Sequence, residues 1–224
     1  MRNITKNLYF IGAMLVASHS QALVIDTFND TPQSVSSGGL TTNTTSASEA
    51  LGGFRQLDIL SNTGPGITAA NVFATASLGI FAHSENVATS GSSRVTWNAI
   101  GMGLGADFTA SNAFFLDTLT IDQGSMDVTI GLTDNNSSDT FTLSNITSSS
   151  SLPSISFYNF SGIDFSSINE IYLEINAGQA SDITLDEIRT MGNPFVTVPE
   201  PATFLLMGMG LVGMIGLRRR NAAT

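Results

Sequence analysis

Short segments in which apolar and polar residues alternate recur through most of the 224-residue chain and constrain its fold more than any other feature. Aliphatic residues occupy alternate positions in Val128–Thr133 and in Ile171–Ile175. Successive side chains of a strand point to opposite faces of a sheet, so each segment places one face in a core and the other in water. Similar patterns mark eight further strand candidates: Leu23–Phe28, Phe54–Leu60, Val72–Phe81, Arg94–Ile100, Phe115–Ile121, Thr140–Leu143, Ile155–Phe160 and Ile183–Thr190.

Glycine, serine and asparagine separate these candidate strands, and no segment longer than a turn or two favours an α-helix within them. Many short strands in one body, residues 23–190, predict an all-β fold: an antiparallel β-sandwich, jelly-roll-like in type. Residues 34–48 differ, because nine of these 15 residues are Ser or Thr and almost none is apolar. We expect residues 34–48 to form a long surface loop or a disordered insertion of the sandwich.

Charge and cysteine content limit what can stabilise this body and what it can bind. The chain has no cysteine, so packing or metal ions must stabilise it in place of disulfides. Residues 23–197 contain three arginines and 17 acidic residues, which gives a formal charge of −14. Such a charge repels nucleic acid and anionic lipid and attracts divalent cations and basic partners, although solubility alone is a sufficient reason for it.

The N-terminal 22 residues have the three parts of a signal peptide. Arg2 and Lys6 form a basic start, and an apolar stretch of ten residues, 8–17, follows. This stretch is too short to span a bilayer stably. Ser20-Gln21-Ala22 is a small-x-small cleavage site, so we expect signal peptidase to cut after Ala22 and leave a mature chain that starts at Leu23.

The C-terminal segment combines a proline-bracketed glutamate, an apolar run and a basic cluster. Pro199-Glu200-Pro201 precedes the uncharged residues 202–217, and Arg218, Arg219 and Arg220 follow them. A helix of these 16 residues is about 24 Å long, which makes it a short hydrophobic span held by its arginines. The arginines favour a cytoplasmic C-terminus. Residues 191–198, with Gly192 and Pro194, are the predicted linker to this membrane helix.

This tail resembles the PEP-CTERM sorting signal of Gram-negative bacteria, with Pro199-Glu200-Pro201 as the motif within residues 199–220. The motif, the span and the arginine cluster all match the pattern. The resemblance implies that an exosortase, a membrane protease-transpeptidase, recognises the motif and removes the hydrophobic tail. It also implies a transient anchor in the inner membrane, followed by delivery to the cell surface or an exopolysaccharide matrix.

Catalytic residues are scarce in the body. A nucleophilic triad needs a base, and His83 is the single histidine of residues 23–197, which contain no cysteine. The shortage of histidine and cysteine also disfavours a zinc site. Paired carboxylates for glycoside hydrolysis would have to come from residues such as Asp117, Asp122 and Asp127, or Glu170 and Glu174. No spacing marks a pair among them, so we do not expect an enzyme.

Calcium is the metal that the acidic residues favour, because it takes about six to eight oxygen ligands. The loop Asp134–Asp139 concentrates such groups, although a polar hairpin loop needs no metal. The body is also similar at fold level to carbohydrate-binding jelly rolls, in which neighbouring terminal strands carry acidic residues near a structural calcium. That resemblance adds residues of the first and last strands, so the candidate ligands are Asp26, Asp134, Asp139 and Asp186.

Sugar binding would use exposed aromatic rings with polar neighbours, because the C–H faces of pyranoses stack on such rings. The candidates are Trp97, Tyr158 and Tyr172. Tyr172 is on the outward side of its strand, opposite Ile171 and Leu173, whereas Trp97 is equally consistent with a core residue.

The whole chain is therefore interpreted as an exported protein, processed by signal peptidase and exosortase, with a structural or adhesive role at the cell surface or in an exopolysaccharide matrix. A lectin-like carbohydrate-binding module, stabilised by calcium in one version, is the alternative hypothesis. A glycoside hydrolase is the third.

Deletion of Pro199–Pro201 tests the sorting prediction. The apolar span remains, so we expect the variant to stay in the membrane fraction with its tail uncut. Immunoblots of membrane and exported fractions from a host that contains an exosortase measure this. Deletion of Asn221–Thr224, which leaves the motif, the span and the arginine cluster intact, is the control. Normal cleavage and export of the Pro199–Pro201 deletion would refute the sorting role of the motif.

Overall fold

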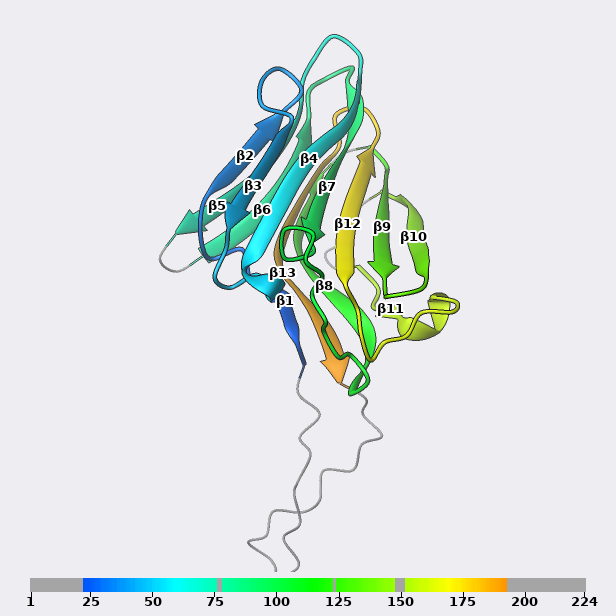
Figure 1. Ribbon diagram of the computed structural model, residues 1–224. Helices are drawn as coiled ribbons and strands as arrows, with labels where there is room; N and C mark the ends of the chain where they lie inside the picture. The colour runs from blue at the N-terminus through cyan, green and yellow to red at the C-terminus, as the bar shows by residue number, and fades with distance from the viewer. Residues whose placement is uncertain (1–21, 76–77, 123, 148–151, 193–224) are drawn as a thin grey trace, which may run out of the picture. The chain divides into compact units, whose positions relative to one another are not determined.

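Two antiparallel sheets, packed face to face, form the body of the protein (Figure 1). The computed structural model describes residues 22–75, 78–122, 124–147 and 152–192. These residues belong to one compact unit, Gln21–Asn193. The second unit, Met1–Ser20 with Pro194–Thr224, lies outside the described residues, and so do the predicted signal-peptide core, the sorting motif and the membrane helix 202–217.

Sheet A has the strand order β11-β8-β13-β6-β5-β2, and β1 pairs with β13 beside β6. Its strands are β1 Val24–Asp26, β2 Gln33–Ser36, β5 Thr68–Thr75, β6 Leu78–Glu85, β8 Ser111–Asp122, β11 Ile155–Ser156 and β13 Asp182–Gly192. Sheet B has the order β10-β9-β12-β7-β4-β3. Its strands are β3 Thr42–Ser46, β4 Phe54–Thr63, β7 Ser90–Trp97, β9 Met126–Thr133, β10 Ser138–Ile146 and β12 Glu170–Ala177. Two 3-10 turns, η1 Leu51–Gly53 and η2 Phe157–Asn159, complete the described elements.

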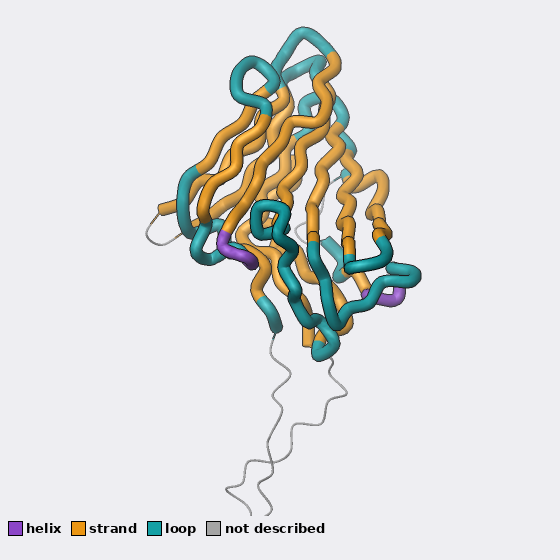
Figure 2. The backbone as a smooth tube through the Cα atoms, in the orientation of Figure 1, coloured by secondary structure: helices purple, strands orange, loops and turns teal. Residues whose placement is uncertain are grey.

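The predicted all-β antiparallel sandwich is confirmed by these two sheets. Figure 2 shows strands in both layers, with loops at the two ends and the two short 3-10 turns at the margins. No helix among the described residues has the length and apolar character needed to cross a membrane.

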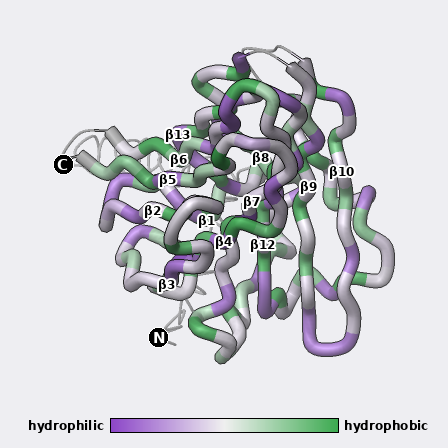
Figure 3. Tube along the Cα trace, turned by 90° about the horizontal axis from the view of Figure 1, so that it is seen from above, coloured by the Kyte–Doolittle hydropathy of each residue, from purple (hydrophilic) through white to green (hydrophobic). Residues whose placement is uncertain are grey.

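The core lies between the sheets, where the alternating residues of each strand meet. Ile171, Leu173 and Ile175 of β12 are fully buried, and the residues between them are half-buried on the opposite face. Phe81, Phe114 and the other inward residues of sheet A close the core from the other side. Figure 3 shows this alternation as green and purple segments that follow one another along the strands.

Three sequence predictions about the strands need correction. Residues 34–48 are not a loop, because they contain most of β2 and all of β3, the edge strands of the two sheets. The stretch Val72–Phe81 is not one strand but the hairpin of β5 and β6. In Ile155–Phe160 the strand β11 ends at Ser156 and η2 follows. An edge strand needs few apolar residues, and threonine favours the extended backbone, so polarity alone is a poor sign of a loop there.

The first and last strands are neighbours and close one end of the body. Val24 pairs with Arg189 and Asp26 pairs with Ile188. The backbone N–H of Thr190 donates to the carbonyl oxygen of Leu23, and the backbone N–H of Leu23 donates to Thr190 Oγ1. β13 runs to Gly192, so the predicted linker 191–198 begins two residues too early.

A buried ion pair joins the two sheets. Arg55 of β4 donates from Nε and Nη2 to the two carboxylate oxygens of Asp26 of β1, at 2.6 and 2.7 Å. Trp97 Nε1 of β7 donates to Asp26 Oδ2 at 2.8 Å. All three side chains are fully buried, and the Arg55 guanidinium also lies over the ring of Phe28, 5.2 Å from its centroid. Asp26 thus ties a terminal strand of sheet A to two strands of sheet B.

Removing one partner of this pair should cost more than removing both. Arg55→Met leaves the Asp26 carboxylate buried without its cation, so we expect a loss of about 3–5 kcal/mol in the free energy of unfolding. The double variant Arg55→Met/Asp26→Asn keeps an acceptor for Trp97 and should recover part of that loss. Urea unfolding measures both, with Arg189→Met as a partly exposed control. Equal losses in the single and double variants would contradict the buried-charge argument.

Candidate functional site

The outer face of sheet B, defined here as the side turned away from sheet A, carries polar side chains from neighbouring strands. On β12 the inward residues are aliphatic, so Glu170, Tyr172, Glu174 and Asn176 all lie on this outer face. The register places the outward residues of the other strands in rows beside them. The sheet thereby arranges side chains from distant parts of the sequence as one continuous surface.

One row of the outer face is centred on Tyr172. Tyr172 pairs with Thr96 of β7 on one side and with Gly131 of β9 on the other. A Cβ atom at Gly131 would lie 2.1 Å from Cε1 of Tyr172, so only glycine leaves room for the tyrosine ring over β9. The predicted outward position of Tyr172 is what the structure shows, and the ring is half-buried.

The next row holds the one arginine of the outer face among the described residues. Arg94 of β7 donates to Glu174 Oε2 from Nη2 at 2.6 Å and from Nε at 3.2 Å. The Arg94 guanidinium also lies 4.1 Å from the centroid of the Tyr172 ring, a cation–π contact. Burial raises the pKa of Tyr172 above its usual value, Arg94 opposes this and the nearby glutamates add to it. Tyr172 is therefore a neutral hydroxyl that can donate and accept.

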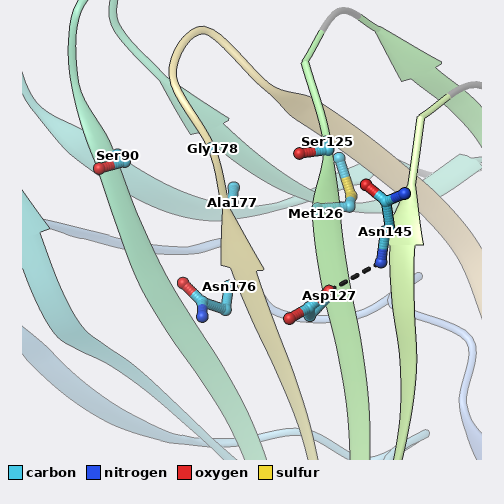
Figure 4. A pocket seen from close by; sticks show the side chains of 8 residues that line it. All are labelled: Ser90, Ser125, Met126, Asp127, Asn145, Asn176, Ala177 and Gly178. Carbon is cyan, nitrogen blue, oxygen red and sulfur yellow. Dashed lines mark hydrogen bonds between the residues drawn. The ribbon is translucent and has the colours of Figure 1, made fainter.

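A pocket of about 330 Å³ lies where the outer face meets the loops at one end of sheet B (Figure 4). Ser90 of β7, Asn176 of β12, Asp127 of β9 and Asn145 of β10 line it from four neighbouring strands, together with Ser125, Met126, Ala177 and Gly178. Asp127 Oδ1 accepts the backbone N–H of Asn145 at 2.8 Å. Among the described residues, the side chains of Ser90 and Asn176 have no hydrogen-bond partner, so they are free for a ligand.

The three predicted sugar-binding aromatic residues do not meet in one place. Trp97 is wrong as a sugar platform, because its ring points inward and is fully buried beside Asp26. Tyr172 lies on the outer face of sheet B. Tyr158 belongs to η2, and its side chain is 97% exposed.

The predicted calcium ligands have other partners. Asp26 is held by Arg55 and Trp97, and Asp186 lies in the bulge of β13 beside Glu187. Burial raises the pKa of Glu187, and Asp186 is one of the carboxylates that raise it further. No group of three or more His, Asp or Glu residues suited to a metal ion is found within the described part of the chain.

Asp134 and Asp139 fasten loops together through backbone N–H groups. Asp134 accepts from the N–H groups of Asn136, Ser137 and Asp164, each at 2.6 Å. Asp139 accepts from Ser161 at 2.5 Å and from Thr140 at 2.8 Å. These bonds hold the pKa of both carboxyl groups below the usual value. The β9–β10 loop is thereby joined to the loop that follows η2.

The candidate catalytic groups are dispersed or buried. His83 Nδ1 lies 2.7 Å from Ser93 Oγ, and His83 Nε2 lies 3.2 Å from Glu85 Oε1, but all three residues are buried between the sheets. Asp117 and Asp122 lie on β8 of sheet A, whereas Asp127 lies on β9 of sheet B. Glu170 and Glu174 share the outer face, where Asn98 Nδ2 donates to Glu170 Oε2 at 2.9 Å and Arg94 Nη2 donates to Glu174 Oε2 at 2.6 Å.

Comparison with known proteins confirms the tail motif: the PEP-CTERM protein-sorting motif matches residues 197–220. No curated protein matches the chain.

Three solved structures illustrate the likeness of the body. The family 11 carbohydrate-binding module of the cellulase Lic26A-Cel5E of Clostridium thermocellum is 14% identical over 79% of this chain and 97% of that one, with a TM-score of 0.39. A module specific for non-crystalline cellulose, CBM28, is 9% identical over 55% and 80%, with a TM-score of 0.36. TmCBM61 in complex with β-1,4-galactotriose is 8% identical over 74% and 90%, with a TM-score of 0.33. At these values the function of this chain has to be inferred from its own side chains.

The carboxylate of Asp134 should make stability depend on pH in the acid range. Because its pKa is lowered by folding from the ordinary 3.8, its contribution is present above that value and is lost as the pH falls through the folded pKa. We expect Asp134→Asn to lower the urea midpoint at pH 7, and the two proteins to converge towards pH 2. Asp122→Asn is the control on an exposed strand end. A deficit of the same size at pH 7 and pH 2 would contradict this role.

Proposed function

We propose that this protein is an exported surface or matrix protein that binds polysaccharide through the outer face of sheet B. The PEP-CTERM motif at residues 197–220 indicates an exported chain that an exosortase processes. Signal peptidase would remove residues 1–22, and the sorting signal would anchor the protein in the membrane only transiently. The proposed destination is the cell surface or the exopolysaccharide layer of a Gram-negative bacterium.

The observation that carries this proposal is the chemistry of the strip that runs from Tyr172 to the pocket at Asn176. Hydroxyl, amide and carboxylate groups of Ser90, Asn176 and Asp127 can together donate and accept hydrogen bonds, as sugar hydroxyls require. Tyr172, at the end of the strip away from the pocket, adds a neutral hydroxyl and an aromatic ring, one face of which Arg94 covers. A small number of placed polar groups beside an aromatic ring is typical of a ligand site.

The dimensions of the strip favour an extended chain of sugars. From Glu170 to Asn176, the outward side chains of β12 cover about 20 Å at about 3.3 Å per residue. A flat, strand-aligned surface of this length can contact several consecutive sugar rings, whereas the pocket at one end can hold one. The site therefore suits a polysaccharide segment better than a free monosaccharide.

Export combined with polysaccharide binding supports an adhesive role. Arg94 donates to Glu174 and Asn98 donates to Glu170, so both glutamates already have partners, which makes the hydrolase hypothesis the weakest. A passive structural protein would need no free polar side chains in a pocket. A protein that retains polysaccharide at the cell surface needs such side chains, and the outer face of sheet B presents them.

Two substitutions on the outer face test the binding site. We expect Tyr172→Ala and Asn176→Ala each to weaken binding by about tenfold or more, equivalent to about 1.4 kcal/mol. Tyr172→Ala loses a contact between its ring and the sugar, and Asn176→Ala loses a hydrogen bond from its side-chain amide. Isothermal calorimetry of the full chain in mild detergent against dextran, mixed-linkage β-glucan and galactomannan measures the affinities. Tyr172→Phe separates the ring from its hydroxyl.

Asn71→Ala on β5 of sheet A is the matched control and should bind as the unsubstituted chain does. Unchanged affinity in both outer-face variants would move the site away from sheet B. If the unsubstituted chain binds none of the polysaccharides, including the host's own exopolysaccharide, the binding proposal fails and a passive structural role remains.

A further inference from the structure

A cluster of aromatic rings supports the loop that contains η2. The rings of Phe157 and Phe165 are stacked, 4.2 Å apart between centroids and 6° from parallel. Phe114 packs against Phe157 at 4.9 Å and against Phe160 at 5.9 Å. Phe108 completes the cluster and is almost fully buried. Because these rings hold one another, the backbone of η2 is a rigid support for the residue that it exposes.

That residue is Tyr158, whose side chain is 97% exposed at the mouth of a second pocket of about 450 Å³. Phe157, Phe160 and Phe165 form the apolar part of the pocket. The volume falls within the range of about 300–1,000 Å³ that small-molecule sites occupy. Tyr158 contributes no buried surface to the core, so its ring is available to a ligand.

The rim of this second pocket is polar. Thr109, Ser111 and Asn112 line it beside the aromatic residues. The Asn112 amide has no hydrogen-bond partner among the described residues, while Ser111 Oγ donates to Thr190. A ligand with both a C–H face and hydroxyl groups would satisfy the ring and the amide together. A purely apolar ligand would leave the Asn112 amide without a partner.

The charges near the second pocket exclude an acidic ligand. Asp107 precedes the lining residues Phe108 and Thr109, and hydrogen bonds from Thr109 lower the pKa of its carboxyl group. Asp164 precedes Phe165, and bonds from Ser166 lower its pKa as well. Both are charged at neutral pH and would repel uronic acids and phospholipid headgroups. A neutral sugar meets no such repulsion.

The second pocket lies at the opposite end of the sandwich from the pocket of Figure 4. Ser111 of its rim pairs with Gly192, the last residue of β13, whereas Gly178 of the first pocket lies just before β13 begins. The ten steps from Asp182 to Gly192 span about 33 Å at about 3.3 Å per residue. Two polysaccharide chains can thus be held at the same time.

We propose that the pocket beside Tyr158 is a second carbohydrate site, which takes a neutral sugar residue and makes the protein a crosslinker of polysaccharide chains. The crosslinking rests on the function proposed for the outer face of sheet B, whereas the second site stands on its own geometry. Two sites on one rigid body raise the avidity for a polymer that presents many copies of the ligand. A monovalent lectin would bind such a polymer without joining two chains.

The whole chain has three tyrosines, so in protein with isotope-labelled tyrosine the ring signal of each can be followed separately. Such protein distinguishes the two sites directly. The full chain in mild detergent is titrated with hexasaccharides of dextran, mixed-linkage β-glucan and galactomannan, and the ring signals are followed by NMR. We expect the signals of Tyr158 and Tyr172 both to shift, with Tyr158→Ala and Tyr172→Ala assigning them. A shift confined to Tyr172 overturns the second site and leaves the first. A shift confined to Tyr158 keeps the second site and removes the first, and no shift removes both.

Crosslinking is measured by the turbidity of the same polymers mixed with the full chain. We expect the turbidity with Tyr158→Ala to be at least fivefold lower than with the unsubstituted chain. The affinity of this variant for the hexasaccharide at Tyr172 should stay unchanged. Tyr158→Phe keeps the ring and should keep the turbidity, and the unchanged affinity of Tyr158→Ala at Tyr172 excludes an effect of misfolding. Turbidity that is equal in Tyr158→Ala and in the unsubstituted chain overturns the crosslinking proposal.

Discussion

The carboxylate of Asp26 is the point at which the two sheets are held in one arrangement. It accepts hydrogen bonds from Arg55 and Trp97 of sheet B, while its own strand pairs with β13 of sheet A. A buried charge must keep its partners at hydrogen-bond distance, because leaving it unpaired in the interior is strongly destabilising. The ion pair therefore fixes how the sheets face each other. The outer face of sheet B depends on it indirectly, because β7 carries Trp97 on its inner side and Arg94 on its outer side.

Much of sheet B could be predicted from the sequence, because its central strands follow the alternating pattern. Val128–Thr133 and Ile171–Ile175 lie within β9 and β12 with the expected residues inward. The edge strands β2 and β3 could not, since Ser- and Thr-rich segments look like loops until a neighbouring strand is known. The ion pair of Asp26 with Arg55 could not be predicted either, because the two residues are 29 positions apart and no local pattern joins them.

The candidate site was predictable only where alternation alone decides the direction of a side chain. Tyr172 lies between two inward aliphatic residues, so its outward position followed from the sequence. Asn176 is the second outward position beyond Tyr172, and the same parity would have found it. Asp127 and Ser90 could not be added, because their place beside Asn176 comes from the pairing of β12 with β9 and β7. The sequence left open whether Trp97 points inward or outward, and its burial beside Asp26 shows that it points inward.

The negative charge of the body, which the sequence leaves open between solubility and ligand attraction, acquires a more specific meaning on the outer face. Glu170, Glu174 and Asp127 lie along the strip, and Glu174 engages Arg94, the one arginine of this face in the described part of the chain. Repulsion over a Debye length of about 8–10 Å covers much of a strip this narrow. A protein selects between ligands by disfavouring the wrong one as well as by binding the right one. Carboxylates around a neutral hydrogen-bonding centre would thus favour neutral polysaccharides over polyuronates without any added contact.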